Sequence, residues 1–92
     1  MRLNLKGALL QDLDGRDLEG SDMSMLVGQA LVGGIEGDAI KQYELALKLR
    51  AGEAELDTSD VELVEKAVKD SKSLTILAKG QILLVLKGGR RV

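Results

Sequence analysis

Residues 38–50 read DAIKQYELALKLR, and this stretch decides the fold. At about 100° per residue in a helix, its apolar side chains cover well over half of the circumference. They fall on one face and on its adjoining flank: Ala39, Ile40, Tyr43, Ala46 and Leu47, then Leu45 and Leu49. Only Lys41, Glu44 and Lys48 form a polar stripe, with Glu44 and Lys48 in the favourable i, i+4 order. We therefore predict a central helix that other segments or a second subunit cover on several sides.

The composition indicates one small domain with an aliphatic core. A chain of 92 residues fits a single domain, 1–92, and its apolar content of 45% is normal for a globular protein. It contains no Phe and no Trp, and Tyr43 is its only aromatic residue. The core must therefore be built from Leu, Val, Ile, Ala and Met, without the large aromatic anchors that often fix small domains.

The residue types that are missing exclude several classes of chemistry. The chain has no Cys and no His, which removes disulfides, Cys/His zinc sites, Ser-His-Asp triads and the usual general base near neutral pH. Carboxylate pairs are the remaining catalytic option, but each Asp and Glu fits a helix cap, a turn or a solvated helix face. We expect no catalytic residue, no cofactor, no metal site and no enzymatic activity.

The hydrophobic runs are too short for a membrane segment. The longest strictly apolar run, Ile82–Leu86, falls far short of the roughly 20 residues that span a bilayer. The opening RLNLKG lacks the apolar core of a signal peptide. We therefore expect a cytoplasmic protein without a membrane partner.

The N-terminal part has the pattern of a β-hairpin. Leu3 and Leu5 alternate with polar neighbours, and Asp14-Gly15 suits a type I′ turn. We predict a hairpin over 2–19 that packs on the helices, because an isolated hairpin is marginal in water. The acidic residues from Asp12 do not form a calcium loop of the EF-hand type, because Arg16, Asp17 and Met23 occupy its positions 5, 6 and 12.

Three helices follow with recognisable caps. Ser21 or Asp22, Asp38 and Asp57 each carry a side-chain oxygen that can accept the free N–H groups at a helix start. Gly33-Gly34 is expected to end the first helix in a left-handed cap. In mid-helix, Gly28 is expected to allow close helix–helix approach. The predicted helices span 22–33, 38–51 and 58–71.

The last apolar segment is open to two interpretations. As a helix, 74–87 has sufficient length, and Gly80 would mirror the packing role of Gly28. As two strands, it would fold about Lys79-Gly80. We prefer the helix, followed by a basic tail over 88–92. The predicted fold class is α+β, mainly α, with an N-terminal β-hairpin packed on a bundle of about four short helices.

The net charge of −2 hides a strong asymmetry. Residues 1–38 balance to −4 and residues 39–70 to −3, whereas residues 71–92 carry five bases and no acid. Complementarity within the chain or between copies is our preferred explanation. An acidic partner or nucleic acid that contacts the C-terminal end is the alternative.

Three stretches together resemble a group of small, mostly uncharacterised proteins encoded in bacteriophages and prophages. They are the opening RLNLKGALLQDLDG, the central YELALKLR, and the dipeptide Gly80-Gln81 within the last apolar segment. None of these stretches is a catalytic or ligand motif, and the group has no assigned activity, so the resemblance transfers no functional residue. It implies a role in phage development inside the bacterial host cell.

The sequence is compatible with two functions. The wide apolar surface of the central helix favours a non-catalytic interaction or assembly protein that forms homodimers or higher oligomers, or binds another protein. Its expected contact residues are Leu45, Leu49 and Leu63. The alternative is a regulatory protein that binds nucleic acid through Lys87, Arg90 and Arg91.

Overall fold

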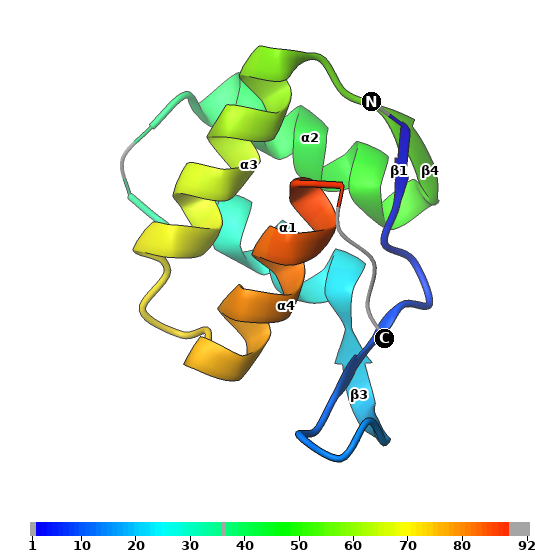
Figure 1. Ribbon diagram of the computed structural model, residues 1–92. Helices are drawn as coiled ribbons and strands as arrows, with labels where there is room; N and C mark the ends of the chain where they lie inside the picture. The colour runs from blue at the N-terminus through cyan, green and yellow to red at the C-terminus, as the bar shows by residue number, and fades with distance from the viewer. Residues whose placement is uncertain (1, 36, 89–92) are drawn as a thin grey trace.

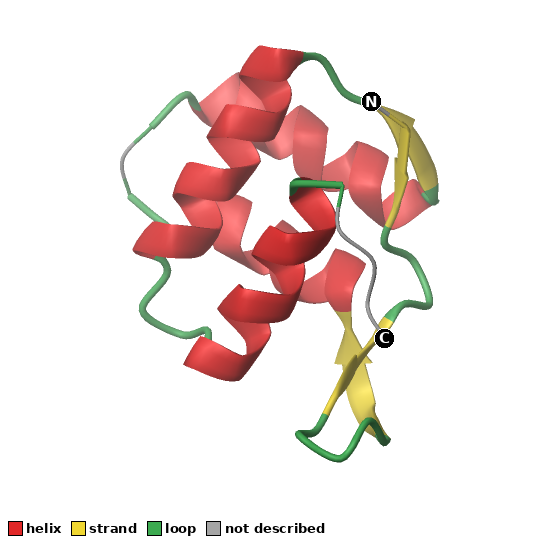
Figure 2. Ribbon diagram, in the orientation of Figure 1, coloured by secondary structure: helices red, strands yellow, loops and turns green. Residues whose placement is uncertain are grey.

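The structure, a computed structural model, describes residues 2–35 and 37–88 (Figure 1). Figure 2 shows a mainly helical α+β fold, which confirms the predicted class. The elements in chain order are β1 (Arg2–Asn4), β2 (Leu9–Gln11), β3 (Asp17–Asp22), α1 (Met23–Val32), α2 (Ala39–Ala51), β4 (Glu53–Glu55), α3 (Thr58–Asp70) and α4 (Ile76–Leu86).

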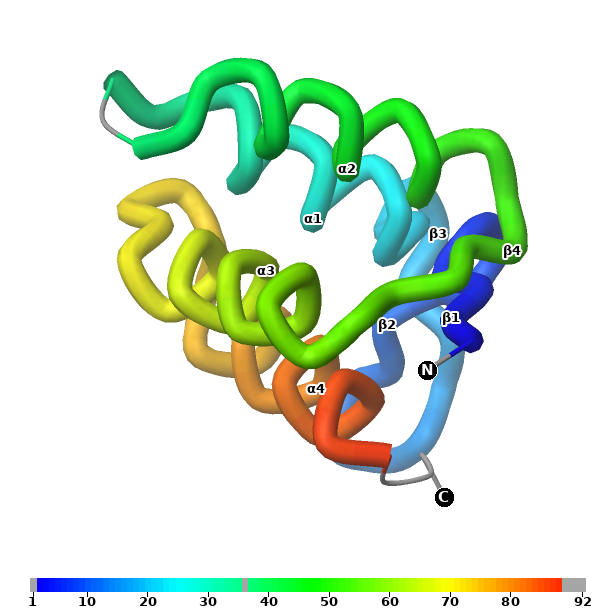
Figure 3. The backbone as a smooth tube through the Cα atoms, turned by 90° about the horizontal axis from the view of Figure 1, so that it is seen from above, coloured from blue at the N-terminus to red at the C-terminus, as the bar shows by residue number. Residues whose placement is uncertain are grey.

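The helices form two layers, with α1 and α2 in one and α3 and α4 in the other (Figure 3). The short strands lie at one end of these layers, and the loops between α1 and α2 and between α3 and α4 lie at the other. The core between the layers is aliphatic, as the composition predicted. Its buried apolar side chains are Leu3, Leu5, Leu10, Met23, Val27, Leu31, Leu45, Ala46, Leu49, Ala54, Leu56, Val64, Val68, Ala78, Ile82 and Leu86.

The predicted single hairpin over 2–19 is wrong in its pairing. β1 pairs antiparallel with β4, which places Leu3 opposite Ala54, and only β2 pairs with β3. In the folded chain Ala54 is buried between two exposed glutamates, which is the alternation of a strand with one face on the core. Arg2 lies 3.4 Å from the carboxylates of both Glu53 and Glu55, so charge also favours this long-range pairing.

The β2–β3 connection turns at the predicted place but not with the predicted geometry. Gly15 has a φ of 83°, and no non-glycine residue of the described chain has a positive φ, so Asp14 cannot sit in a type I′ turn. The Gly15 N–H instead donates to the Asp12 carbonyl at 3.0 Å. The Asp12 side chain accepts from the backbone N–H groups of Asp14 and Arg16. This is a wider loop, organised by an aspartate side chain.

The helix starts follow the predicted capping chemistry. Asp22, Asp38 and Asp57 are the N-caps of α1, α2 and α3, and each side chain accepts a hydrogen bond from the first turn. The last segment is a helix, and its N-cap is Thr75. The predicted left-handed end of α1 is wrong, because Gly33 has a φ of −82° and donates its N–H to the Gln29 carbonyl.

The two mid-helix glycines play different parts. Gly28 is buried, and a Cβ on it would lie 3.7–4.0 Å from Ala46 and Arg50 of α2, in ordinary contact. Gly28 therefore lies against α2, but this approach leaves room for a Cβ, so the prediction that it depends on a glycine is not supported. The same role for Gly80 is wrong, since Gly80 is exposed and a Cβ there would meet no atom within 4 Å.

A side-chain amide joins the two ends of the chain. Gln81 on α4 accepts the Gln11 N–H at 2.9 Å through Oε1 and donates Nε2–H to the Gln11 carbonyl at 2.6 Å. Because it satisfies both backbone groups of one strand residue, Gln81 acts as a substitute for a neighbouring strand. The pairing fixes α4 against the β2–β3 hairpin.

Replacing Gly80 by Ala is expected to raise the free energy of unfolding by about 0.5–1 kcal/mol, because Ala is favoured over Gly inside a helix. Gly52→Ala is the matched control. It should lower stability, because the φ of 126° at Gly52 is unfavourable for a residue with a Cβ. Urea unfolding followed by circular dichroism measures both changes. A Gly80→Ala protein that is less stable would show that this position is not open.

Candidate interaction surface

The apolar arc of α2 divides into a buried half and an exposed half. Leu45, Ala46 and Leu49 are buried in the core of the single chain. Ile40 is 73% exposed, Tyr43 59% and Leu47 53%. Other segments of the chain therefore cover only one half of the apolar arc, and cover of the other half by a second subunit stays a prediction. Leu45 and Leu49, predicted as contact residues for another protein, are not available to a partner, since the other segments already cover them.

Helix geometry explains this division. Gly28 of α1 packs near Ala46, so α1 covers that side of α2, and Leu45 and Leu49 lie next to it towards the core. At about 100° per residue, Leu47 points roughly a quarter turn away from Ala46, and Ile40 lies near Leu47. The two helical layers leave this side of α2 uncovered.

The exposed half continues onto α1 and the loop that follows it. We define the outer face as the exposed apolar residues of these segments: Met25, Val32, Ile35, Ile40, Tyr43 and Leu47. Val32, Ile35 and Tyr43 line one shallow hollow of about 250 Å³, which shows that the contributions of the helices meet. The sequence identified the α2 residues as apolar but did not show which of them other segments of the chain cover. Met25, Val32 and Ile35 were missed, because single apolar residues off the periodic face of a helix or in a loop give no pattern.

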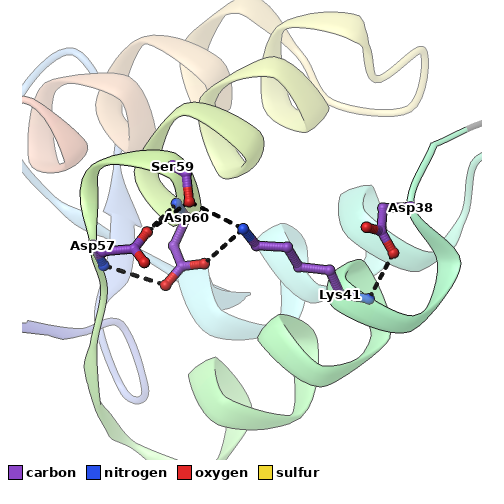
Figure 4. Close-up of polar contacts among 5 residues, drawn as sticks. All are labelled: Asp38, Lys41, Asp57, Ser59 and Asp60. Carbon is purple, nitrogen blue, oxygen red and sulfur yellow. Dashed lines mark hydrogen bonds and ion pairs between the residues drawn. The ribbon is translucent and has the colours of Figure 1, made fainter.

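The charged side chains on the polar border of α2 differ in whether they contact another residue of the chain. Lys41 reaches across to α3, where its Nζ lies 3.0 Å from the Ser59 hydroxyl and 3.4 Å from Asp60 (Figure 4). Within the described part of the chain, neither Glu44 nor Lys48 makes a side-chain hydrogen bond or an ion pair. The predicted Glu44–Lys48 pair is thus not formed, and both charges stand free beside the outer face.

The N-terminal cap of α3 holds in place the side chains that Lys41 contacts. Asp57 and Asp60 form a capping box, in which each carboxylate accepts the backbone N–H of the other (Figure 4). The backbone N–H of Asp60 and the hydroxyl of Ser59 hold the pKa of Asp57 below its ordinary value of 3.8, and the charge of Lys41 adds to this. The cap therefore keeps the Asp57 carboxylate ionised, and the contact of Lys41 positions α2 on α3.

A second polar cluster lies at the start of α1. The Asp22 carboxylate accepts the Gly7 N–H at 2.9 Å, the Ser24 N–H at 2.8 Å and the Ser24 hydroxyl at 2.6 Å. The buried Ser24 hydroxyl in turn accepts from Arg50 at 3.0 Å. The Ser24 hydroxyl, with the N–H groups of Gly7 and Ser24, holds the pKa of Asp22 below 3.8, although partial burial opposes the shift. These bonds join the N-terminal turn, α1 and α2.

Leu63, the third predicted contact residue, lies elsewhere. It is half-buried and lines a cleft of about 580 Å³ between the loop after α1 and the C-terminal end of α3. The cleft is lined by apolar side chains and by Lys66, Asp70 and Lys72. Ile35 of the outer face lines the same cleft, so Leu63 lies beside one edge of that face. Leu45 and Leu49 are buried in the core, so the structure does not bring the three predicted contact residues together.

The structure also locates the predicted basic contact residues and the acidic side chains that a metal site would need. Lys87 is exposed at the C-cap of α4, whereas Arg90 and Arg91 lie outside the described residues. Among residues 2–35 and 37–88, no three acidic side chains lie close enough to hold a metal ion. The Asp12 side chain, considered above for calcium, instead holds the hairpin loop. No helix in the described chain has the length and apolar character to cross a bilayer.

Comparisons with known proteins add no identity. No protein-family model matches the chain, and neither a curated protein nor a solved structure matches it. The resemblance to phage and prophage proteins therefore stays a prediction.

Asp22→Asn should lower the free energy of unfolding at pH 7 by about 1 kcal/mol, because an amide cannot accept all of the hydrogen bonds that the carboxylate accepts. The folded pKa of Asp22 lies below 3.8, so its contribution is full above pH 3.8 and is lost as the pH falls through the folded pKa. The difference between the two proteins should therefore shrink below pH 3.8. Urea unfolding of both proteins at pH values from about 2.5 to about 7 measures this difference in the free energy of unfolding.

The control is Asp14→Asn, which removes the same charge from the exposed hairpin loop. A difference between wild type and Asp22→Asn that stays constant with pH would contradict the assignment of the cap to an ionised carboxylate.

Proposed function

We propose that this protein is a non-catalytic assembly protein that associates with itself through the outer face. The observation that supports this proposal is the exposed half of the apolar arc of α2. Contiguous apolar surface of this kind on a small soluble domain marks interaction sites, because its burial releases ordered water. Tyr and Met are also enriched at protein interfaces, and Tyr43 and Met25 both belong to the outer face.

The acidic residues of the helix caps also favour assembly over catalysis. In the described chain, the carboxyl groups of Asp22 and Asp57 both have a pKa below the ordinary value, and both serve as helix caps. A carboxylate acting as a general acid would need a raised pKa. We therefore assign the protein no reaction, cofactor or metal. By the resemblance of its sequence, we place it in the cytoplasm of a bacterial host, as a product of a phage or prophage.

The nucleic-acid alternative depends on the basic residues after position 70. Of its three expected contact residues, Lys87 alone lies in the described chain, where it is exposed. The sequence pI of 5.1 and the single aromatic residue both oppose such a role. We therefore favour a protein partner, and first a second copy of this chain.

Leu47→Ser should convert the wild-type oligomer to monomer while the fold is retained, because Leu47 is 53% exposed and contributes mainly to the outer face. Leu84→Ser on α4 is the matched control. Leu84 is 57% exposed but lies in the other helical layer, so its replacement should leave the oligomer intact. Size-exclusion chromatography with light scattering gives the masses, and circular dichroism checks the fold.

Wild-type protein that stays monomeric at high concentration would contradict self-association. Equal effects of Leu47→Ser and Leu84→Ser would contradict the assignment of the outer face.

A further inference from the structure

The charges beside the outer face define how two copies fit together. We infer that the protein forms a two-fold dimer in which α2 packs antiparallel to the α2 of its partner, with Glu44 paired to the partner's Lys48 and Lys48 to the partner's Glu44. This inference rests on the proposed self-association. It adds the orientation, the register and the residues that select them.

The orientation follows from charge. Glu44 and Lys48 lie one helical turn apart on the same border of α2, on the side away from α1. In a parallel pair about a two-fold axis along the helices, the charged border of one copy would face the flank on which its partner carries α1, and α1 has no charged side chain. An antiparallel pair places the two charged borders on the same flank, where each charge lies opposite the other kind. The antiparallel arrangement is therefore the one that pairs these charges, and it is favoured.

Lys48 is the cation assigned to the interface, because the other two cations of α2 already make contacts within their own chain. Lys41 already binds Asp60 and Ser59 of α3 within the same chain. Arg50 donates to the buried Ser24 on the opposite side of the helix. Lys48 is exposed and has no side-chain partner in the described chain, and the same is true of Glu44. These are the charges that a second copy can pair without breaking an existing contact.

The register then brings the apolar residues into contact. Pairing Glu44 with the partner's Lys48 places the two-fold axis at the level of Ala46 along the helix. Leu47 then lies beside the axis, between the partner's Tyr43 and the partner's Leu47. Ile40 falls opposite the partner's Ala51, which is also exposed at the end of its helix. One register thus satisfies both the charges and the apolar stripe.

The position of α1 is compatible with this arrangement. Gly28 against Ala46 places α1 roughly a quarter turn around α2 from Leu47. In the antiparallel dimer the two α1 helices therefore lie side by side on one flank, and the charged border lies on the other. Met25 and Val32 of α1 face the centre of the resulting group of four helices. The dimer therefore covers the outer face from both helices.

The test mixes two single variants. Glu44→Lys carries only cations at the two positions and Lys48→Glu only anions, so each homodimer should bind about tenfold more weakly than wild type at low salt. When the two variants are mixed, every pair across the interface becomes opposite in sign. The heterodimer should then dominate. Native mass spectrometry of one isotope-labelled and one unlabelled variant counts the three dimers directly.

The matched control is the same exchange on α3, Glu62→Lys with Lys66→Glu, which has the same i, i+4 spacing on an exposed face. That mixture should give homodimers and heterodimers in the statistical ratio of 1:2:1, as expected for charges outside the interface. Because repulsion within one helix is the same in homodimer and heterodimer, a preference for the heterodimer reports only contacts between chains.

A statistical mixture for the α2 variants, from a wild-type protein that dimerises, would overturn the antiparallel pairing and leave the proposed self-association standing. A wild-type protein that is monomeric under the same conditions would overturn both. A dominant heterodimer for the α2 variants together with a statistical mixture for the α3 variants supports the inference.

Discussion

The packing of α1 on α2 is the contact on which the rest of the structure depends. Gly28 of α1 lies against Ala46 and the stem of Arg50 on α2, at a distance that would also accommodate a Cβ, and the two helices pack on each other. This contact fixes the rotation of α2 about its own axis. Leu45 and Leu49 must then point to the core, and Ile40 and Leu47 must point away from it. A helix that is apolar on both sides cannot be covered by one small domain.

Long-range hydrogen bonds at the edges of the core hold this arrangement together. Ser24 and Arg50 join the start of α1 to the end of α2, and Lys41 joins the start of α2 to the capping box of α3. Gln81 joins α4 to the backbone of β2. Gln81 satisfies backbone groups that the regular structure leaves without partners, whereas Arg50 and Lys41 contact polar side chains at the starts of α1 and α3. An aliphatic core without aromatic anchors is thereby given a definite geometry.

Local chemistry in the sequence was enough to predict the helices and most of their starts. Asp22, Asp38 and Asp57 cap as expected because capping depends on neighbouring residues alone. The pairing of β1 with β4 was not predictable in this way, since about half of the chain lies between the two strands and Glu53–Glu55 is too short to show a periodic pattern. The same limit explains the interaction surface. The width of the apolar arc on α2 follows from the sequence, but which half stays exposed depends on where α1 packs.

The central claim, that the exposed half of α2 is covered by a second copy, can be tested with the protein's own fluorescence. The chain has one tyrosine and no tryptophan, so the intrinsic signal reports Tyr43 on the outer face. Acrylamide quenching measured at increasing protein concentration follows the access of solvent to this ring. We expect quenching to fall as dimers form, because the partner covers Tyr43. Quenching that stays equally strong at every concentration would contradict the account.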